Sequence, residues 1–291
     1  MQIVTDAGAD LSPAQTEGLA FHKVPLTFTL DGVTYRSGID IGPDRFYEVL
    51  AATDSFPSTS QPAPGEFADL YRQIVAAGDS EILSIHISSG LSGTLNAARL
   101  GAQQAPEAHV TFVDTLTLSG AEGWQVEAAG RMAQAGWPLA RILPILERIG
   151  QFTETYYTLE TLKYLEHGGR ISHLQALLGQ ILDLKPIIGV EKERGTYVVH
   201  ARERSLKRAI NKLAEITIER FGAAEPMRIQ VMHGHNAAGA AHLEALLAQR
   251  FSAHFLPIGV IAPVLGAHTG PGLVGVCAAP ARVFADIPGM I

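Results

Sequence analysis

The sequence predicts an α/β protein of two domains, the first with a mostly parallel β-sheet. In the first half, short β-like runs such as residues 3–5 and 82–87 alternate with helical patterns. A chain of 291 residues suffices for one large or two ordinary domains. The pattern changes from about Pro138. We therefore predict a first domain at 1–150 and a second α/β or α+β domain at 151–291.

Turn and helix signals predict the remaining elements of the first half. Asp31-Gly32, between two β-like runs, indicates a β-hairpin within residues 23–39. Residues 58–64, Ser-Thr-Ser-Gln-Pro-Ala-Pro, are expected to be a loop without regular structure. Another β-like run covers 109–113, and helical patterns cover 43–52, 65–77 and 120–134.

The second half mixes helical and β-like patterns. Helices are expected at 139–149, 161–170, 174–182, 205–219 and 237–250. Strands are expected at 153–159, 186–190, 197–201, 228–233, 255–262 and 272–278.

The composition excludes several classes of protein. Hydrophobic residues make up 47% of the chain, enough for full apolar cores. The formal net charge of −7 argues against general nucleic-acid binding, which needs a basic surface. Apolar runs such as 255–265 are too short and too interrupted by proline and glycine to span a bilayer. The lone cysteine, Cys277, and the absence of a signal-peptide pattern favour a cytoplasmic protein, with Cys277 as a core residue.

The turn at 88–94, Ser-Ser-Gly-Leu-Ser-Gly-Thr, is the most informative segment. It ends an apolar run and opens directly into an alanine-rich helical pattern. A strand, turn and helix in this order direct backbone N–H groups to one place, where phosphate or carboxylate binds. Four hydroxyl residues around Gly90 and Gly93 exceed what an N-cap needs, although N-capping is the alternative. The lysine of a phosphate-binding loop and the second glycine of a nucleophile elbow are both missing.

Thr59 and Ser60 belong to a second hydroxyl cluster. In an open α/β sheet, the loops at the carboxyl ends of the strands surround one crevice. Thr59, Ser60 and Ser92 are therefore expected to meet there, with Asp6 and Asp114 at neighbouring strand ends. A surface loop without function is the alternative.

His268 is a third candidate for anion binding. It lies in a glycine-rich stretch, 265–272, and an imidazole N–H donates readily to an anion. An ordinary surface turn is the alternative. His233 and His235 resemble a metal pair, but no partner at ligand spacing accompanies them, so no metal site is expected.

Basic residues are concentrated at 185–212. This segment holds eight lysine and arginine residues against three glutamates, in an otherwise acidic chain. A solvated face is the ordinary explanation, and a docking surface for an acidic partner is the alternative. Arg170 extends the basic region in the second case.

Together these segments resemble the DegV family, whose characterised members are fatty-acid-binding subunits of bacterial fatty acid kinase. The matching segments occur in the family's order: 3–6 with 10–11, 59–67, 88–94, 113–115, 162–165 with 168–171, 184–187 and 268–272. One departure is Ala7-Gly8-Ala9, which lacks the hydroxyls usual after the first aspartate and argues against a hydrogen-bonding role for that turn.

The resemblance implies two α/β domains with a fatty acid in a tunnel between them, no cofactor, and no catalysis by this chain alone. The carboxylate of the acid would contact Thr59, Ser92 and His268. In family members a separate kinase phosphorylates the bound acid, and the acyl phosphate then feeds phospholipid synthesis. Neighbours of the carboxylate would be Ser60, Ser89, Gly93 and Thr269, and contacts to the kinase or phosphate would be Arg170 and Arg202.

The apolar segments 171–188 and 258–265 are expected to line such a tunnel. Each buried methylene contributes about 0.8 kcal/mol, so sixteen carbons contribute on the order of 10 kcal/mol before ordering costs. We therefore attribute affinity to the tail and orientation to the hydroxyls. One alternative is a serine hydrolase or acyltransferase with Ser92 as nucleophile and His268 as base. Another is a binder of small anions or phosphosugars without a tunnel.

Overall fold

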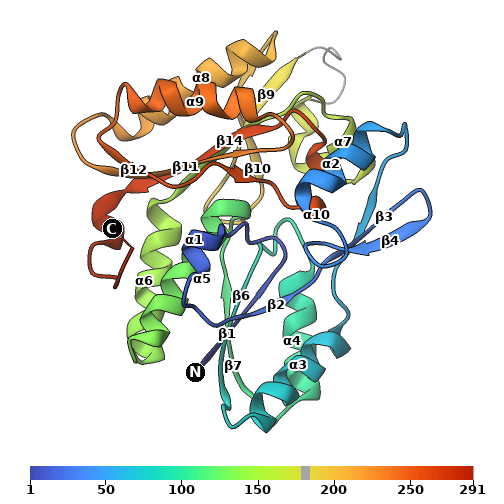
Figure 1. Ribbon diagram of the computed structural model, residues 1–291, viewed down its shortest axis with the longest axis vertical. Helices are drawn as coiled ribbons and strands as arrows, with labels where there is room; N and C mark the ends of the chain where they lie inside the picture. The colour runs from blue at the N-terminus through green and yellow to red at the C-terminus, as the bar shows by residue number, and fades with distance from the viewer. Residues whose placement is uncertain (178–183, 291) are drawn as a thin grey trace.

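The computed structural model describes residues 1–177 and 184–290. In this part of the chain the strands form three sheets, and Figure 1 shows helices packed on the two larger ones. The first sheet is parallel, in the order β2-β1-β6-β7. Its strands are β1 (Gln2–Asp6), β2 (His22–Val24), β6 (Glu81–His86) and β7 (His109–Asp114). The predicted α/β class with a parallel sheet is confirmed.

Helices cover both faces of the parallel sheet. On one face, α3 (Pro64–Ala76) and α4 (Thr94–Gln104) pack against each other, and Phe67 and Tyr71 join Ile82 in one core cluster. On the other face lies α5 (Ser119–Gln134), and its Trp124 is fully buried. Residues 119–130 of α5 are all buried, because this helix lies between the parallel sheet and the sheet of the second half.

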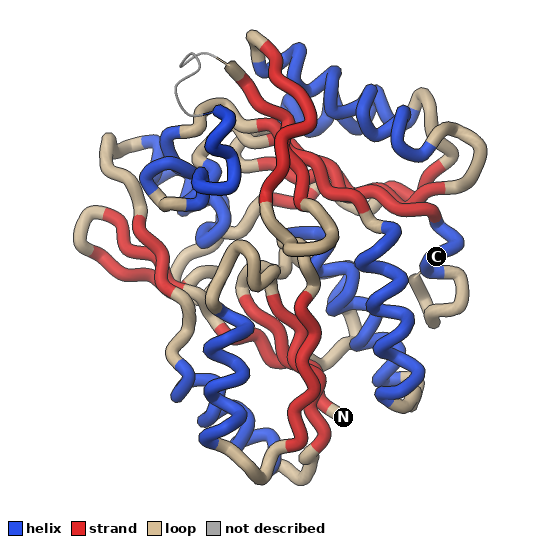
Figure 2. The backbone as a smooth tube through the Cα atoms, turned by 180° about the vertical axis from the view of Figure 1, so that it is seen from behind, coloured by secondary structure: helices blue, strands red, loops and turns tan. Residues whose placement is uncertain are grey.

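A small antiparallel sheet, β4-β3-β5, projects from the body of the molecule (Figure 2). Its strands are β3 (Thr27–Leu30), β4 (Val33–Arg36) and β5 (Ser58–Ser60), and α2 (Pro43–Ala51) packs nearby. The predicted hairpin is confirmed: Asp31 and Gly32 both have positive φ, 51° and 77°, as its tight turn requires.

The prediction of a loop at 58–64 was wrong for its first three residues. Ser58–Ser60 is strand β5, and its register pairs Phe28 with Thr59. A strand of three residues has no recognisable pattern of its own, since its conformation is set by pairing with β3. Pro62 and Pro64 then end the pairing and begin α3.

The second half forms a seven-stranded sheet in the order β10-β9-β8-β14-β11-β12, with β13 also paired to β11. Helices α8 (Leu206–Phe221) and α9 (Ala237–Ala248) cover one face (Figure 1). On the other face lie α5 and α6 (Leu139–Phe152). The strands are β8 (Glu154–Thr158), β9 (Lys185–Val190), β10 (Tyr197–Glu203), β11 (Met227–His233), β12 (Ala253–Phe255), β13 (Gly259–Val260) and β14 (Val274–Pro280).

Short helices complete the described chain: α1 (Pro13–Thr16), α7 (Lys163–His167), η1 (Arg170–Leu177), α10 (Pro263–Thr269) and η2 (Ala281–Phe284). The single strand predicted at 255–262 was wrong, because Leu256-Pro257-Ile258 separates two short strands. The helix predicted at 174–182 is a 3-10 segment up to Leu177, and residues 178–183 lie outside the described residues.

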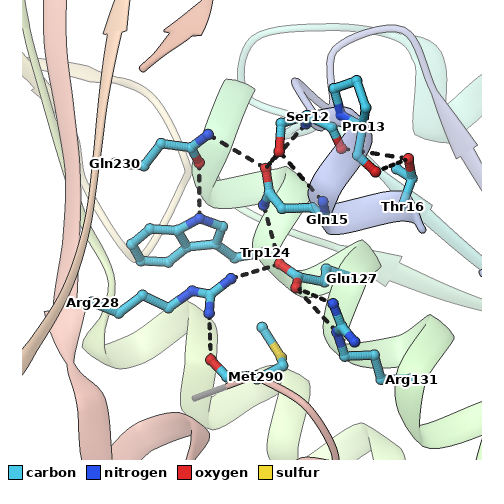
Figure 3. Close-up of polar contacts among 10 residues, drawn as sticks. All are labelled: Ser12, Pro13, Gln15, Thr16, Trp124, Glu127, Arg131, Arg228, Gln230 and Met290. Atoms are coloured by element: carbon cyan, nitrogen blue, oxygen red, sulfur yellow. Dashed lines mark hydrogen bonds and ion pairs between the residues drawn. The ribbon is translucent and has the colours of Figure 1, made fainter. Parts of the chain in front are cut away.

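A buried polar network, which we call the interdomain clamp, links the two halves of the chain (Figure 3). Glu127 on α5 accepts from Arg228 on β11 at 2.6 Å, and both side chains are 3% exposed. Gln15 donates to the same carboxylate at 3.1 Å. Trp124 donates its indole N–H to Gln230 on β11 at 3.0 Å. The clamp therefore fixes α5 against the seven-stranded sheet.

The sheets divide near the predicted domain boundary: in the described chain, the seven-stranded sheet uses only strands after residue 150. Because α5 and α6 pack on that sheet as well, the division at 1–150 and 151–291 stays a prediction. Within residues 1–177 and 184–290, no helix has the length and apolar character needed to cross a membrane.

Candidate functional site

Loops from both halves of the chain gather between the parallel sheet and the seven-stranded sheet (Figure 2). They line a partly open cavity of about 310 Å³, which we call the hydroxyl-lined cavity. Its volume is at the lower end of the range for small-molecule sites. It lies at the carboxyl ends of parallel strands, where such sheets bind ligands. The wall consists of Leu26, Thr59, Ser60, Gln61, Ile87, Leu91, Ser92, Leu118, Arg170, Tyr197, Val264, Leu265 and His268.

Five of the predicted site residues line this cavity: Thr59, Ser60, Ser92, Arg170 and His268. Pairing of β5 with β3 places Thr59 opposite Phe28, and α10 carries His268 in its last turn. The Thr59 hydroxyl and His268 Nε2 are 2.8 Å apart. Ser92 lies directly before α4, and its hydroxyl is 2.8 Å from that of Thr94. The polar groups are thus brought together from three separate segments.

His268 is held as a neutral imidazole. Burial, and to a lesser degree the nearby Arg170 guanidinium, lower the pKa of His268 to about 4. Its Nδ1 is buried without a hydrogen-bond partner among the described residues. Gly168 lies so close that any Cβ there would collide with this nitrogen. A neutral imidazole beside hydroxyls can donate to an anion without carrying a charge.

Among the described residues, Arg170 is the one cationic side chain in the cavity wall. Its guanidinium donates to the carbonyl of Gly168 at 2.7 Å. This contact holds the charge beside His268, where it favours an anionic ligand and disfavours protonation of the imidazole.

The other predicted site residues lie beside the cavity rather than in its wall. Ser89 is exposed and its hydroxyl donates to Asp114 at 2.5 Å. Gly93 caps α4, and a Cβ there would collide with the Gln61 amide. Thr269 is buried, and its hydroxyl donates to the carbonyl of Leu265 at 3.2 Å.

Next to the hydroxyl-lined cavity lies a narrow apolar space of about 10 Å³, which we call the apolar channel. The two share Leu118, Tyr197 and Leu265. Residues from the predicted tunnel segments occur here, among them Ile188 and Ile261, whereas residues 178–183 lie outside the described residues. The channel wall is Leu118, Ser119, Tyr157, Leu159, Ile188, Tyr197, Ile261, Leu265, Thr269 and Leu273.

Asp6 and Asp114 were expected beside the crevice, but neither lines the hydroxyl-lined cavity in the described structure. Asp6 is fully buried and accepts from His86 Nδ1 at 2.9 Å and from the backbone N–H groups of Gly8 and Ile87. Asp114 accepts from Ser89. Both carboxylates therefore fix the loops that carry the cavity wall.

Sequence reasoning did not single out Gln61 and Tyr197 as wall residues. Gln61 directly follows the Thr59-Ser60 pair, so its place in the same loop was the available signal. Tyr197 comes from the start of β10, and no local pattern connects it with the hydroxyl residues.

The basic segment is largely ion-paired in the described structure. Salt bridges join Lys185 to Glu160, Arg208 to Glu203 and Lys212 to Glu215. Arg202 is exposed on β10 and is not in the wall of the cavity. In residues 1–177 and 184–290, no group of three histidine, cysteine or acidic side chains is placed to hold a metal ion.

The geometry does not assemble a serine nucleophile with its base. The Ser92 hydroxyl pairs with Thr94, and His268 Nε2 pairs with Thr59. Among the described residues, no carboxylate orients His268, since its Nδ1 has no partner and its charged neighbour is Arg170.

Comparisons with known proteins find similar DegV proteins that match nearly the whole chain. The profile of a family described as "Uncharacterised protein, DegV family" matches residues 1–281. A DegV domain-containing protein of Deinococcus radiodurans is 36% identical over 283 residues, covering 96% of this chain and 98% of that protein.

Solved structures include a DegV family protein of Thermus thermophilus, described for its fatty acid binding. It is 32% identical with a TM-score of 0.85, covering 96% of this chain and 99% of that one. DegV of Bacillus subtilis, described as a fatty acid binding protein, is 29% identical with a TM-score of 0.86, and the match covers 96% of this chain and 98% of that one.

Proposed function

Since the chain belongs to the DegV family, we propose that it binds one long-chain fatty acid. The carboxylate lies in the hydroxyl-lined cavity and the tail extends into the apolar channel. The observation that carries this proposal is that the two spaces share wall residues: a polar wall of Thr59, Ser92 and His268 adjoins an apolar wall at Leu118 and Leu265.

The polar wall suits a carboxylate because its donors can be redirected. Thr59 pairs with His268, and Ser92 pairs with Thr94, so each hydroxyl can turn its proton from a side-chain partner toward a ligand. The Ser92 oxygen also accepts from the backbone N–H of Thr94 at 3.3 Å, a contact that it can keep while donating to the ligand. Hydrogen bonds from neutral donors to a carboxylate are strong and favour its ionised form. Ser60 and Arg170 complete this wall, and Gly93 and Thr269 support its shape, whereas the Ser89 hydroxyl bonds Asp114 outside it.

The tail supplies most of the affinity. At about 0.8 kcal/mol for each buried methylene, a sixteen-carbon chain contributes on the order of 10 kcal/mol before ordering costs. The channel, at about 10 Å³, must widen to take it, by movement of side chains such as Tyr157 and Tyr197. Its walls come from both halves of the chain, and their apolar residues belong to one hydrophobic core cluster, so the widening moves side chains within that core.

We further propose that a separate fatty acid kinase phosphorylates the bound carboxylate in the cytoplasm, where ATP is available, and that the acyl phosphate serves phospholipid metabolism. Arg170, in the cavity wall, would stabilise the charge added by phosphorylation. Arg202, exposed on β10, would contact the kinase. The chain itself acts as a carrier and performs no reaction alone.

Organic extraction of the purified protein, followed by mass spectrometry, tests the lipid-binding proposal. We expect close to one long-chain fatty acid per protein molecule. Absence of fatty acid from the extract, together with failure of the protein to bind added palmitate, would contradict the proposal.

A reconstituted assay with ATP and a fatty acid kinase of the same organism tests the carrier role. Acyl phosphate is expected only when carrier, kinase and ATP are all present. Arg202→Glu is expected to reduce acyl phosphate formation while palmitate binding persists. An equal loss of both would show that Arg202 has another role.

The serine hydrolase alternative has a separate test. Incubation with an activated acyl ester and intact-mass measurement would reveal an acyl group on Ser92 if it were a nucleophile. We expect no adduct, because no described side chain is placed to activate this hydroxyl.

A further inference from the structure

Asp10 is a buried carboxylate that joins two segments lying far from it in the sequence. It follows β1 in the loop before α1 and is 8% exposed. Its Oδ2 accepts from the Ser119 hydroxyl at 2.6 Å, across a separation of 109 residues. Its Oδ1 accepts from the backbone N–H of Ala262 at 3.0 Å, across a separation of 252 residues. One side chain thus connects the start of α5 to the start of α10.

These two connected segments carry the wall of the apolar channel. Leu118 and Ser119, at the start of α5, belong to that wall, and so do Leu265 and Thr269 on α10. Ala262 directly precedes α10, which also carries His268. In the described structure Asp10 is not itself part of either wall. Asp10 contacts the start of α5 and the residue before α10 from outside the channel, so it can fix the distance between these two helices.

The backbone reinforces the connection at Ser119. Asp10 donates its N–H to the carbonyl of Ser119 at 3.3 Å, and Ser119 donates its own to the carbonyl of Gly8 at 2.9 Å. Ser119 has a φ of 58°, which a residue with a side chain adopts only when its surroundings hold it there. The contacts to the loop after β1 supply that restraint.

We propose that Asp10 is a positioning residue that holds α5 and α10 at the separation required for the apolar channel to accept a long acyl chain. This role rests on the proposed function. It concerns the tail of the ligand and not its carboxylate. Loss of Asp10 should therefore reduce the binding free energy that each added methylene contributes. Loss of a cavity hydroxyl should instead weaken the binding of fatty acids of every chain length by the same factor.

The surroundings of Asp10 are consistent with this role. Lys23 donates to the carbonyl of Ala9 at 3.1 Å and lies close enough to stabilise the carboxylate. Burial raises the pKa of Asp10 to about 6, against the lowering effects of Ser119, Lys23 and Ala262. The group is thus ionised at pH 7, with both oxygens available as acceptors.

Affinities for a series of saturated fatty acids, from decanoate to palmitate, test the proposal. In the wild-type protein we expect affinity to rise about fourfold for each added methylene, as full burial of the chain implies. In Asp10→Ala the rise should fall to about twofold, because a displaced wall buries less of each methylene. The readout is this slope, which a general loss of stability does not change.

Three variants make the test specific. Asp10→Asn keeps an acceptor for Ala262 and presents an amide to Ser119, whose hydroxyl can accept, so it should restore the wild-type slope. Ser119→Ala keeps a Cβ at the same strained φ and removes one of the two contacts, so an intermediate slope is expected. Ser92→Ala, in the cavity wall, should lower all affinities by one factor and leave the slope unchanged.

A wild-type slope in both Asp10→Ala and Ser119→Ala would overturn the role of Asp10 while leaving the proposed function intact. An Asp10→Asn variant as impaired as Asp10→Ala would also overturn it. If Asp10→Ala does not fold, Ser119→Ala and Asp10→Asn decide the matter. Wild-type protein that binds none of these acids would overturn the proposed function, and this role with it.

Discussion

The interdomain clamp and the hydroxyl-lined cavity both join the two halves of the chain, and they use polar side chains in opposite ways. In the clamp, the Glu127 carboxylate accepts hydrogen bonds from Arg228, Gln15 and Arg131, and the Glu127–Arg228 pair is almost completely buried. In the cavity, the Thr59 hydroxyl pairs with His268 Nε2, the Ser92 hydroxyl pairs with that of Thr94, and His268 Nδ1 has no partner in the described structure. The clamp holds the two halves together, whereas the cavity keeps its donors available to a ligand.

This difference predicts two kinds of variant. A change in the clamp should lower the free energy of unfolding more than the affinity for fatty acid. A change in the cavity should do the reverse, since its hydroxyl pairs contribute little to stability.

Arg228→Ala should have the largest effect on stability. It leaves Glu127 as a buried carboxylate without its main cation, which typically costs about 3–5 kcal/mol of the free energy of unfolding. Chemical denaturation followed by circular dichroism measures the loss. The exposed pair of Arg282 and Glu225 offers a matched control, and Arg282→Ala should cost less than about 1 kcal/mol. Similar losses for the two variants would remove the distinction between clamp and surface.

Ser92→Ala should have the largest effect on binding. Removal of one donor from a buried polar site is expected to weaken carboxylate binding by about 1–3 kcal/mol. Calorimetric titration with palmitate measures the change, and denaturation should show nearly wild-type stability. Ser89→Ala is the control, because Ser89 belongs to the same turn but bonds Asp114 outside the cavity. The contrast fails if both serine variants bind palmitate equally well.

Gly168→Ala should displace the His268 side chain, which lies in the cavity wall. The added methyl group would collide with the His268 ring, which must move away from Thr59. Because the ring can rotate, we expect a loss near the lower end for overpacking, about 1 kcal/mol in binding. Titration with palmitate measures this loss. Wild-type affinity in the variant would show that the place of the imidazole does not matter.

The pH dependence of stability should reveal the neutral His268. Its pKa is lowered to about 4 in the folded protein, so between about pH 6.5 and pH 4 the unfolded chain binds a proton that the folded chain does not. The contribution of His268 to the free energy of unfolding therefore decreases as the pH falls from about 6.5 to about 4. Asp10, with its pKa raised to about 6, acts in the opposite direction. His268→Gln should make the decline of stability toward pH 4.5 smaller than in the wild type, and an unchanged decline would contradict the assignment.

The sequence predicted what depends on local pattern. The alternation of strands and helices indicated the parallel sheet, and Asp31-Gly32 indicated the hairpin. Topology brought Thr59, Ser60 and Ser92 to one crevice, and the structure places all three in one cavity wall. The glycine-rich stretch at 265–272 indicated His268 as a further candidate, the resemblance joined it to the same carboxylate, and it lies in the same wall.

Contacts between residues that are far apart in the chain could not be predicted from the sequence. Glu127 and Arg228 are 101 residues apart, and nothing near either residue indicates the other. Strand β5 exists because β3 pairs with it, and the helix at α10 replaces the glycine-rich turn that the sequence allowed. Asp6 and Asp114 follow neighbouring strands as expected, but their side chains turn to the loops and not to the cavity.

The most direct test of the central claim is the carboxyl signal of bound palmitate labelled with ¹³C at its first carbon, measured by NMR in lipid-free protein to which the acid is added. Our account predicts a single shifted resonance that stays ionised between pH 8 and pH 5 and moves in Ser92→Ala and His268→Gln. A resonance that titrates like that of the acid in micelles, and is the same in both variants, would show that the carboxylate does not lie in the hydroxyl-lined cavity.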